Sequence, residues 1–412
     1  MTTSVDTAAD TGQPEVLRNQ MVDDLLLAND SLPRLASATV EAVMRKVPRE
    51  EFLPGVPLPE VYKADDVVRI KLDENGNTIS SASAPWLVAL MLQEADVRPG
   101  HRVFEVGTAS GINACYLSRL VGETGEVVSV EFDGDLIDSA RRGLAATECT
   151  NVEVIHGDGE HGAPGRGVFD RVIVTVQSGD LAKAWMDQLA PDGLMVVPLY
   201  LRGISRSVTF EPEGDHWRSR AAHVCGFVDM QGEGACSRQV VTFDDGVFLR
   251  VYEGQDVDAQ AMTDAMATPA HQVWTGVPTP GIEFTHLDFW LAATLGNYGR
   301  YIGTGDAVKE GRFGQTVGLG GTATWDGDTL AYVTYRKTES AEGFEFGAWA
   351  HGPNREQLAA RLAGEIRRWA EDRRGGPEPT VRAYRAGTPD DQLAAGQVVD
   401  LRHTRIVLCT DG

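Results

Sequence analysis

The sequence has few of the features that are typical of metal-binding, nucleic-acid-binding or membrane proteins. Its five cysteines are scattered, none stands in a CxxC pair, and no Cys/His cluster has the spacing of a zinc site. The formal net charge of -23 argues against a phosphate backbone or an anionic membrane surface as a partner, since both require clustered Lys and Arg. No apolar run approaches the length of a membrane helix. We therefore expect no metal, no nucleic-acid partner and no membrane partner.

The first residues also lack targeting features. Residues 1–16 are polar and acidic, without the basic and apolar regions of a signal peptide, and we expect a disordered tail there. An odd number of cysteines in a long chain favours reduced thiols. Together these features predict a cytoplasmic protein. The cysteines are Cys115, Cys149, Cys225, Cys236 and Cys409.

The chain of 412 residues is long enough for two or three domains. Residues 16–30 and 36–54 have apolar residues at helical spacing, which predicts two amphipathic helices joined by a turn near Ser31 to Pro33. Residues 73–85 have loop chemistry, with Asn75-Gly76 as a turn. From about Arg102 to Leu201, strands alternate with helices, which predicts a parallel, doubly wound sheet.

The pattern changes after residue 220. We expect connecting strands over 221–255 and an α+β domain over 256–412, following a domain over 17–220. Within the last domain we expect helices over 259–274 and 286–303, and strands broken by glycines over 313–338. Residues 355–374 form one long predicted helix. Its apolar stripe consists of Leu358, Leu362, Ile366 and Trp369.

The stretch "VFEVGTASGIN" (residues 103–113) is typical of a strand that runs into a glycine turn and a helix. Such a turn presents backbone N–H groups at the carboxyl edge of a sheet, where nucleotides bind. A dinucleotide fingerprint needs glycines at 107, 109 and 112, and only Gly107 fits. The spacing is GxxxG, from Gly107 to Gly111, preceded by Glu105. This loop suits a ligand that has no pyrophosphate.

Two further acids follow the next two predicted strands. Glu131 ends one strand and can accept from both hydroxyls of a ribose. Asp158 ends the next and can accept from an adenine amino group, while Gly159 allows the ring to approach. Acids at three successive strand ends favour S-adenosylmethionine, with S-adenosylhomocysteine as the product. Thr175 follows the fourth strand, either in the site or in sheet packing.

The sequence resembles the protein-L-isoaspartate O-methyltransferases over residues 17–210. The matching pieces include "VEAVMRKVPREEFLP", "SAPWLVALML", "VFEVGTASGINACYLSRLVG", "VVSVEFD", "GDGEHG" and "QLAPDGLMVVPL". The resemblance implies a Rossmann-like catalytic domain with N-terminal helices and S-adenosylmethionine as cofactor. It further implies that Ser83, with Ser81, hydrogen-bonds the substrate carboxylate. The cofactor would be fixed by Glu105, Gly107, Thr108, Ser110, Gly111, Glu131, Asp158, Gly159 and Thr175.

The chain departs from the family pattern at two places. The usual Thr-Ile-Ser-x-Pro reads Ser-Ala-Ser-Ala-Pro over residues 81–85, and the middle glycine of the loop is Ala109. The whole chain, with "HGPNREQLAARLAGEIRRW", "GTPDDQL" and "RHTRIVL", resembles a branch called the FxLD-system methyltransferases. That branch accompanies ribosomally made, modified peptides such as lanthipeptides. The resemblance implies a modified precursor peptide as partner, methylated on an aspartate that proceeds through succinimide to isoaspartate. Whether the C-terminal domain recognises that peptide, dimerises or buttresses the catalytic domain stays open.

Two other functions stay open at this stage. The chain is either the biosynthetic enzyme, a repair enzyme for isoaspartate in damaged proteins, or a binding protein that keeps the fold without the chemistry. The oligomeric state is open as well. Several further groups are assigned to packing or solvent: His156 and His161, the aromatic set Trp290, Tyr298 and Tyr301, and a basic group of Arg367, Arg368, Arg373 and Arg374 that otherwise suits an acidic leader peptide. "GQTVGLGGTATW" lacks Gly-Lys-Ser/Thr and is assigned to a strand turn.

Overall fold

The computed structural model describes residues 13–27, 34–279, 284–317, 320–339 and 343–410. The chain forms two compact units that are not contiguous in sequence. The first unit consists of Met1–Pro198, Ser207–Pro212 and Cys225–Ala235, and the second of Leu199–Arg206, Glu213–Val224 and Cys236–Gly412.

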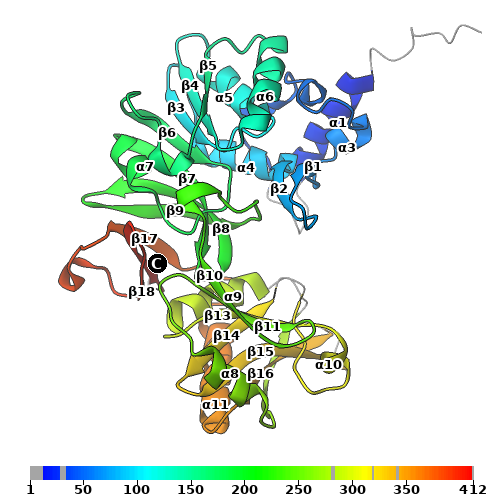
Figure 1. The fold of residues 1–412 in the computed structure, drawn as a ribbon, viewed down its shortest axis with the longest axis vertical. Coiled ribbons are helices and arrows are strands. Elements are labelled where there is room, and N and C mark those ends of the chain that lie inside the picture. The colour runs from blue at the N-terminus through cyan, green and yellow to red at the C-terminus, as the bar shows by residue number, and fades with distance from the viewer. Residues whose placement is uncertain (1–12, 28–33, 280–283, 318–319, 340–342, 411–412) are drawn as a thin grey trace, which may run out of the picture. The chain divides into compact units, whose positions relative to one another are not determined.

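The first unit contains a sheet with strand order β7-β6-β3-β4-β5 in which all neighbouring strands are parallel (Figure 1). The predicted parallel, doubly wound sheet is confirmed. Its strands are β3 (Arg102–Val106), β4 (Glu126–Glu131), β5 (Val152–His156), β6 (Phe169–Val174) and β7 (Leu189–Leu201), with β8 (Ile204–Glu213) following. The helices are α1 (Gln13–Leu26), α2 (Ala38–Met44), η1 (Arg49–Phe52), α3 (Leu58–Val61), α4 (Pro85–Ala95), α5 (Ile112–Val121), α6 (Gly134–Ala146), η2 (Gly159–His161), α7 (Lys183–Gln188) and η3 (Gly232–Gly234).

Local sequence explains why this sheet forms. The strand "RVFEV" is almost continuously buried, as expected for a parallel strand covered on both faces. Asp133 caps α6 by accepting from the backbone N–H of Asp135, and Pro85 occupies the first turn of α4, where its missing N–H costs nothing. Helices α2 and α4 contact each other, and α2 also contacts α5. The apolar faces of these helices and strands form one core.

The second unit is built on antiparallel strands. One sheet has the order β10-β11-β13-β14-β15-β16-β12, and a second set of strands has the order β18-β19-β17-β9. Helix α11 packs on β12, β15 and β16, and all four residues of its predicted stripe are buried. The strands are β9 (His216–Val224), β10 (Arg238–Asp244), β11 (Val247–Tyr252), β12 (His271–Thr279), β13 (Gly299–Gly303), β14 (Gly321–Asp326), β15 (Thr329–Lys337), β16 (Phe344–His351), β17 (Thr380–Arg385), β18 (Gln397–Asp400) and β19 (Thr404–Cys409). The helices are α8 (Ala259–Met266), α9 (Phe284–Thr294), α10 (Asp306–Lys309), α11 (Arg355–Asp372) and η4 (Asp390–Gln392).

Several sequence expectations about local structure are wrong. Helix α1 begins at Gln13, so residues 13–16 are helical; residues 1–12 and the expected turn at Ser31 to Pro33 lie outside the described residues. The expected loop over 73–85 contains β2 (Thr78–Ala82), which pairs with β1 (Val68–Leu72). The two expected helices of the last domain end early, because β12 and β13 follow α8 and α9. By contrast, the expected strands over 221–255 are present as β10 and β11, which belong to the seven-stranded sheet, and the bounds of the domains stay a prediction.

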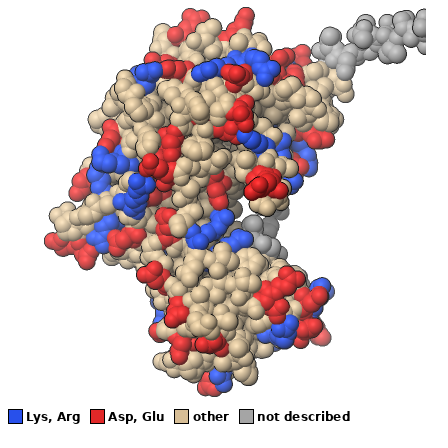
Figure 2. Space-filling model, in the orientation of Figure 1, with Lys and Arg blue, Asp and Glu red and all other residues tan. Residues whose placement is uncertain are grey.

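Two further observations concern the surface charge and the length of the helices. On the face shown in Figure 2, acidic side chains are scattered among basic ones. Within the described ranges, no helix combines the length and the apolar character that crossing a membrane requires.

Candidate functional site

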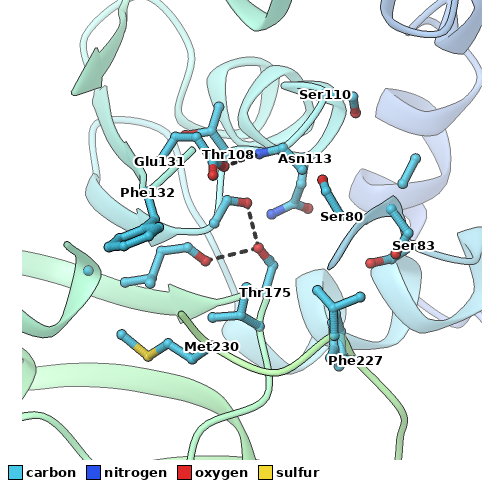
Figure 3. A pocket seen from close by; sticks show the side chains of 18 of the residues that line it. Ser80, Ser83, Thr108, Ser110, Asn113, Glu131, Phe132, Thr175, Phe227 and Met230 are labelled. Carbon is cyan, nitrogen blue, oxygen red and sulfur yellow. Dashed lines mark hydrogen bonds between the residues drawn. The ribbon is translucent and has the colours of Figure 1, made fainter. Parts of the chain in front are cut away.

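The carboxyl ends of the parallel strands meet at one pocket of the first unit. Strand order reverses beside β3, because β4 and β5 extend the sheet on one side and β6 and β7 on the other. Ligands of such sheets bind in the crevice at this reversal. Residues that follow β3, β4, β5 and β6 all line the pocket, and the loop before α4 and the segment 227–231 complete it (Figure 3). The pocket therefore lies where the sequence predicts a nucleotide site.

Most of the predicted site residues line this pocket. They are Ser81, Ser83, Gly107, Thr108, Ser110, Glu131, Gly159 and Thr175. Glu105, Gly111 and Asp158 are not among the lining residues. Phe132 and Met230 lie toward one end of the pocket in Figure 3 and Ser83 toward the other, with Thr175 between them. An aromatic side chain lies at each end, Phe132 near Glu131 and Phe227 near Ser83.

Two glycines of the lining are required by close approach. A Cβ on Gly107 would lie 2.8 Å from Thr175 Oγ1, and its φ of +95° is a left-handed conformation. A Cβ on Gly159 would lie 2.4 Å from Val106 Cγ1. Thr175 donates to the carbonyl oxygens of Val106 (2.9 Å) and Gly107 (2.7 Å), so its hydroxyl hydrogen supports the loop. These contacts hold the strand ends close together at the floor of the pocket.

Glu131 connects the glycine loop to the end of β4. One carboxylate oxygen accepts from the backbone N–H of Ala109 at 2.7 Å, and the other accepts from the N–H of Asp133 at 2.9 Å. Burial raises the pKa of Glu131 above its usual value, although these backbone donors oppose the rise. Each oxygen keeps a further acceptor site, which is what two ribose hydroxyls require.

Asp158 and Gly111 support the site from outside the lining. Asp158 accepts from the backbone N–H groups of Glu160 (3.0 Å) and Glu233 (2.8 Å), which ties segment 227–233 to the end of β5. Gly111 begins α5 at a φ of +90°, with Ala140 of α6 only 3.3 Å from where a Cβ would stand. Both residues shape the pocket, and their direct contact with a cofactor stays a prediction.

Glu105 is a buried carboxyl beneath the glycine loop. It is 0% exposed and accepts from Asn113 Nδ2 at 2.7 Å and from the Ser129 hydroxyl. Burial raises its pKa to about 7, against the two donors. The carboxyl therefore changes between its protonated and ionised forms near neutral pH. In this structure it fixes Asn113 and the glycine loop.

The raised pKa of Glu105 predicts a pH-dependent stability. A folded-state pKa above the unfolded value stabilises the fold at low pH, and this contribution is lost as pH rises from about 4.5 through about 7. The loss amounts to about 3 kcal/mol. We expect Glu105→Gln to match the wild type in denaturant unfolding at pH 5 and to be more stable at pH 8. Equal wild-type and variant stability at both pH values would contradict this assignment.

Ala109 has a left-handed backbone conformation, with a φ of +44°. This is the position at which the resembled family has glycine, and an alanine there costs about 1–2 kcal/mol of strain. We expect Ala109→Gly to raise the free energy of unfolding by up to about 1 kcal/mol, because the relief of strain exceeds the entropy that glycine adds to the unfolded chain. The matched control is Ala145→Gly on the surface of α6, which should destabilise the protein by up to about 1 kcal/mol.

Comparison with known proteins agrees with this geometry. Residues 21–233 match the family described as protein-L-isoaspartate(D-aspartate) O-methyltransferase (PCMT). A protein-L-isoaspartate O-methyltransferase of Bradyrhizobium sp. is 38% identical over 184 residues, which cover 44% of this chain and 81% of the relative. One of Methanopyrus kandleri is 38% identical over 205 residues, which cover 49% of this chain and 88% of the relative.

The chain belongs to the protein-L-isoaspartate(D-aspartate) O-methyltransferase family. The resemblance stated from the sequence is confirmed at this level, as is the prediction of an S-adenosylmethionine-dependent carboxyl O-methyltransferase with a Rossmann-like catalytic domain. The narrower branch that acts on lanthipeptides stays a prediction.

The second unit also has a counterpart among solved structures. A solved protein titled protein-L-isoaspartate O-methyltransferase shares the fold with a TM-score of 0.50 at 19% identity, over 96% of this chain and 99% of its own. The fold of a family member therefore extends over both units. The C-terminal extension alone does not separate a biosynthetic enzyme from other members of the family.

The structure places several further residues in the pocket that the sequence analysis did not predict. They are Arg49, Ser80, Asn113, Phe132 and the segment Phe227–Gln231. Phe132 directly follows Glu131, so its position was available from the strand end. The segment 227–231 has no motif; it is held by backbone bonds of Gln177 with Val228 and Met230. Only the tertiary structure brings it to the site.

The remaining candidates lie outside the pocket. The His156 ring contacts the Phe132 carbonyl oxygen at 3.2 Å, and His161 is exposed near Glu233. Trp290, Tyr298 and Tyr301 are all buried, so their assignment to the core is confirmed, although they stand on α9, a loop and β13. The basic group at the end of α11 and just beyond it is engaged locally. Arg367 donates to the Thr275 carbonyl oxygen and Arg368 pairs with Glu365, whereas Arg373 lies over the ring of Trp290 and Arg374 over the ring of Trp369. "GQTVGLGGTATW" leads into β14, and two of its residues lie outside the described ranges.

Proposed function

We propose that the protein methyl-esterifies an aspartate carboxylate in a ribosomally made, modified peptide, from which succinimide and then isoaspartate form. The observation that carries the proposal is the pair Ser81 and Ser83 in the same pocket as the glycine loop. Among the described residues, neither hydroxyl makes a hydrogen bond, so both are available to a substrate. The C-terminal sequence resemblance supports the modified peptide as the substrate class.

The residues present fit S-adenosylmethionine. Glu131 offers acceptors for the ribose, Phe132 and the close approach permitted by Gly159 suit the adenine, and the glycine loop has no pyrophosphate to hold. The cofactor supplies an electrophilic methyl group. We infer that the nucleoside lies toward Phe132 and Met230 and that the methyl group faces Ser83, which follows the order of these residues in Figure 3.

The chemistry requires alignment rather than proton transfer. A substrate carboxylate has a reference pKa of about 3.9 and is ionised at neutral pH, so no general base is needed. Ser83, assisted by Ser81, donates to one carboxylate oxygen and leaves the other free to attack. Orientation of the two reactants supplies about 7–11 kcal/mol in well-aligned systems. Methoxide is a far better leaving group than the oxide of a carboxylate, so the next backbone nitrogen of the substrate attacks the ester carbonyl. The succinimide closes as the C–OCH3 bond breaks, and the amide proton leaves with the methoxide as methanol.

The second candidate function is the repair of isoaspartate in damaged proteins. The names of the relatives and the fold shared over both units support it. The two candidates differ in substrate preference. One modified peptide and two linear peptides of the same sequence, with aspartate or isoaspartate at one position, distinguish them. The biosynthetic proposal predicts base-labile methyl ester on the modified peptide and little on either linear form. A strong preference for the linear isoaspartyl peptide would overturn it in favour of repair.

A further inference from the structure

Arg49 is a buried arginine of the pocket lining, and one of its terminal nitrogens has no hydrogen-bond partner among the described residues. It stands on η1, within the "VPREEFLP" segment, and is 1% exposed. Its Nε donates to the Val61 carbonyl oxygen at 2.9 Å, whereas the terminal nitrogen Nη2 has no hydrogen-bond partner among the described residues. Arg49 also lines the pocket. One part of the guanidinium is therefore anchored, and another part is left to a ligand.

The missing partner matters because the group is charged. Across the described ranges, no carboxylate lies within ion-pair distance of Arg49. A buried charge without a partner costs several kcal/mol, and proteins rarely retain one unless it has a role. The phenol of Tyr116 lies close to the Arg49 guanidinium and is fully buried; burial raises the pKa of this phenol against the influence of Arg49, so it stays neutral and offers Arg49 no countercharge. An anionic ligand would supply the negative charge that the described residues do not provide.

Ser80 is a second and independent unsatisfied group of the same pocket. It is 6% exposed, and its hydroxyl has no hydrogen-bond partner in the described part of the chain. Figure 3 shows Ser80 beside Asn113, and both residues line the pocket together with Ser83. A buried hydroxyl and a buried guanidinium that line one pocket both lack partners.

We propose that Arg49 and Ser80 form a carboxylate-binding subsite of the pocket. The subsite rests on the proposed function, which supplies two sources of a carboxylate: the amino-acid end of S-adenosylmethionine and the peptide substrate. A guanidinium presents a planar fork of donors that matches a carboxylate, and a hydroxyl adds one donor. The pocket has no glycine-rich phosphate loop, and Glu131 would repel a doubly charged phosphate.

The test measures binding of two nucleosides that differ in the carboxylate. S-Adenosylhomocysteine carries the amino-acid carboxylate, and methylthioadenosine shares the nucleoside and lacks it. Calorimetry compares the wild type with Arg49→Gln, Arg49→Lys and Ser80→Ala. The control is Arg171→Gln, which removes a buried arginine whose nitrogens bond the carbonyl oxygens of Ala95, Asp170 and Asp96 outside the pocket lining.

Each outcome decides the proposal. If the cofactor supplies the carboxylate, Arg49→Gln weakens S-adenosylhomocysteine at least tenfold, Ser80→Ala weakens it less, and methylthioadenosine is unaffected. If the substrate supplies it, both nucleosides bind normally and the KM for the peptide rises at least tenfold. Equal weakening of both nucleosides, or no change in any constant with Ser80→Ala and Arg49→Lys, would overturn the subsite. The nucleoside measurements need no peptide. If the wild type binds methylthioadenosine, the subsite is tested even where the proposed peptide substrate proves wrong.

Discussion

Replacing Ser83 with alanine is expected to lower kcat by about 100-fold, because loss of one preorganised donor at a reacting oxygen has an effect of this size. Ser83 lines the pocket and its hydroxyl makes no hydrogen bond with the described residues, so its removal leaves no group of the described protein unpaired. The fold should therefore keep its stability. Ser81→Ala should have a smaller effect, and the double variant should lose at least as much as Ser83→Ala.

Single-turnover kinetics at saturating S-adenosylmethionine measure this effect, and calorimetry with S-adenosylhomocysteine shows whether the cofactor still binds. The control is Ser139→Ala on α6, a serine that is not part of the pocket lining. A Ser83→Ala variant with wild-type kcat would remove Ser83 from the mechanism. A loss of cofactor affinity with unchanged kcat would place its hydroxyl on the cofactor.

Replacing Glu131 with glutamine should weaken the binding of S-adenosylmethionine by about 100-fold, since hydrogen bonds to a charged acceptor contribute about 1.5–3 kcal/mol. The amide would place an NH₂ group against the N–H of either Ala109 or Asp133, both of which now donate to the carboxylate. The glycine loop and the ribose site are then disturbed together. The control is Glu126→Gln, at the exposed start of the same strand, where the carboxylate pairs with Arg102.

The pH dependence of cofactor binding follows from the same carboxylate. Because burial raises the pKa of Glu131, the acceptor form is lost at a higher pH than for an ordinary glutamate. We expect affinity for S-adenosylhomocysteine to fall on acidification in the wild type, and this fall to disappear in Glu131→Gln. Calorimetry across the acidic range measures it. An affinity that is flat with pH in the wild type would contradict the role of the ionised carboxylate.

The sequence was most informative where chemistry and periodicity coincide. Continuous apolar strands and strand-end acids predict the parallel sheet and place Gly107, Glu131 and Gly159 at one edge, because parallel strands share a carboxyl edge. The same reasoning could not distinguish residues that line the pocket from residues that only hold the lining in place. Glu105 and Asp158 stand at strand ends too, yet their side chains are taken by Asn113, Ser129 and two backbone N–H groups.

Other parts of the site depend on long-range packing. Arg49 lines the pocket although more than fifty residues separate it from the glycine loop, and its segment carries a family resemblance rather than a chemical motif. Segment 227–231 belongs to the first unit, whereas the strands on both sides of it belong to the second. No local sequence pattern indicates that the two units alternate along the chain in this way. Helical spacing over 259–274 and 286–303 likewise did not show where α8 and α9 end and the following strands begin.

The central claim is the transfer of a methyl group to a carboxylate of an aspartyl residue in a peptide. Mass spectrometry of a lanthipeptide-type modified peptide that contains aspartate, after incubation with the protein and S-adenosylmethionine, tests it most directly. We expect a transient gain of one methyl group at an aspartate, removable by mild base, followed by loss of methanol to leave a succinimide. A methyl group that resists base, or no methylation of that peptide by a protein that binds S-adenosylhomocysteine, would contradict it, and turnover of an isoaspartyl peptide instead would favour repair.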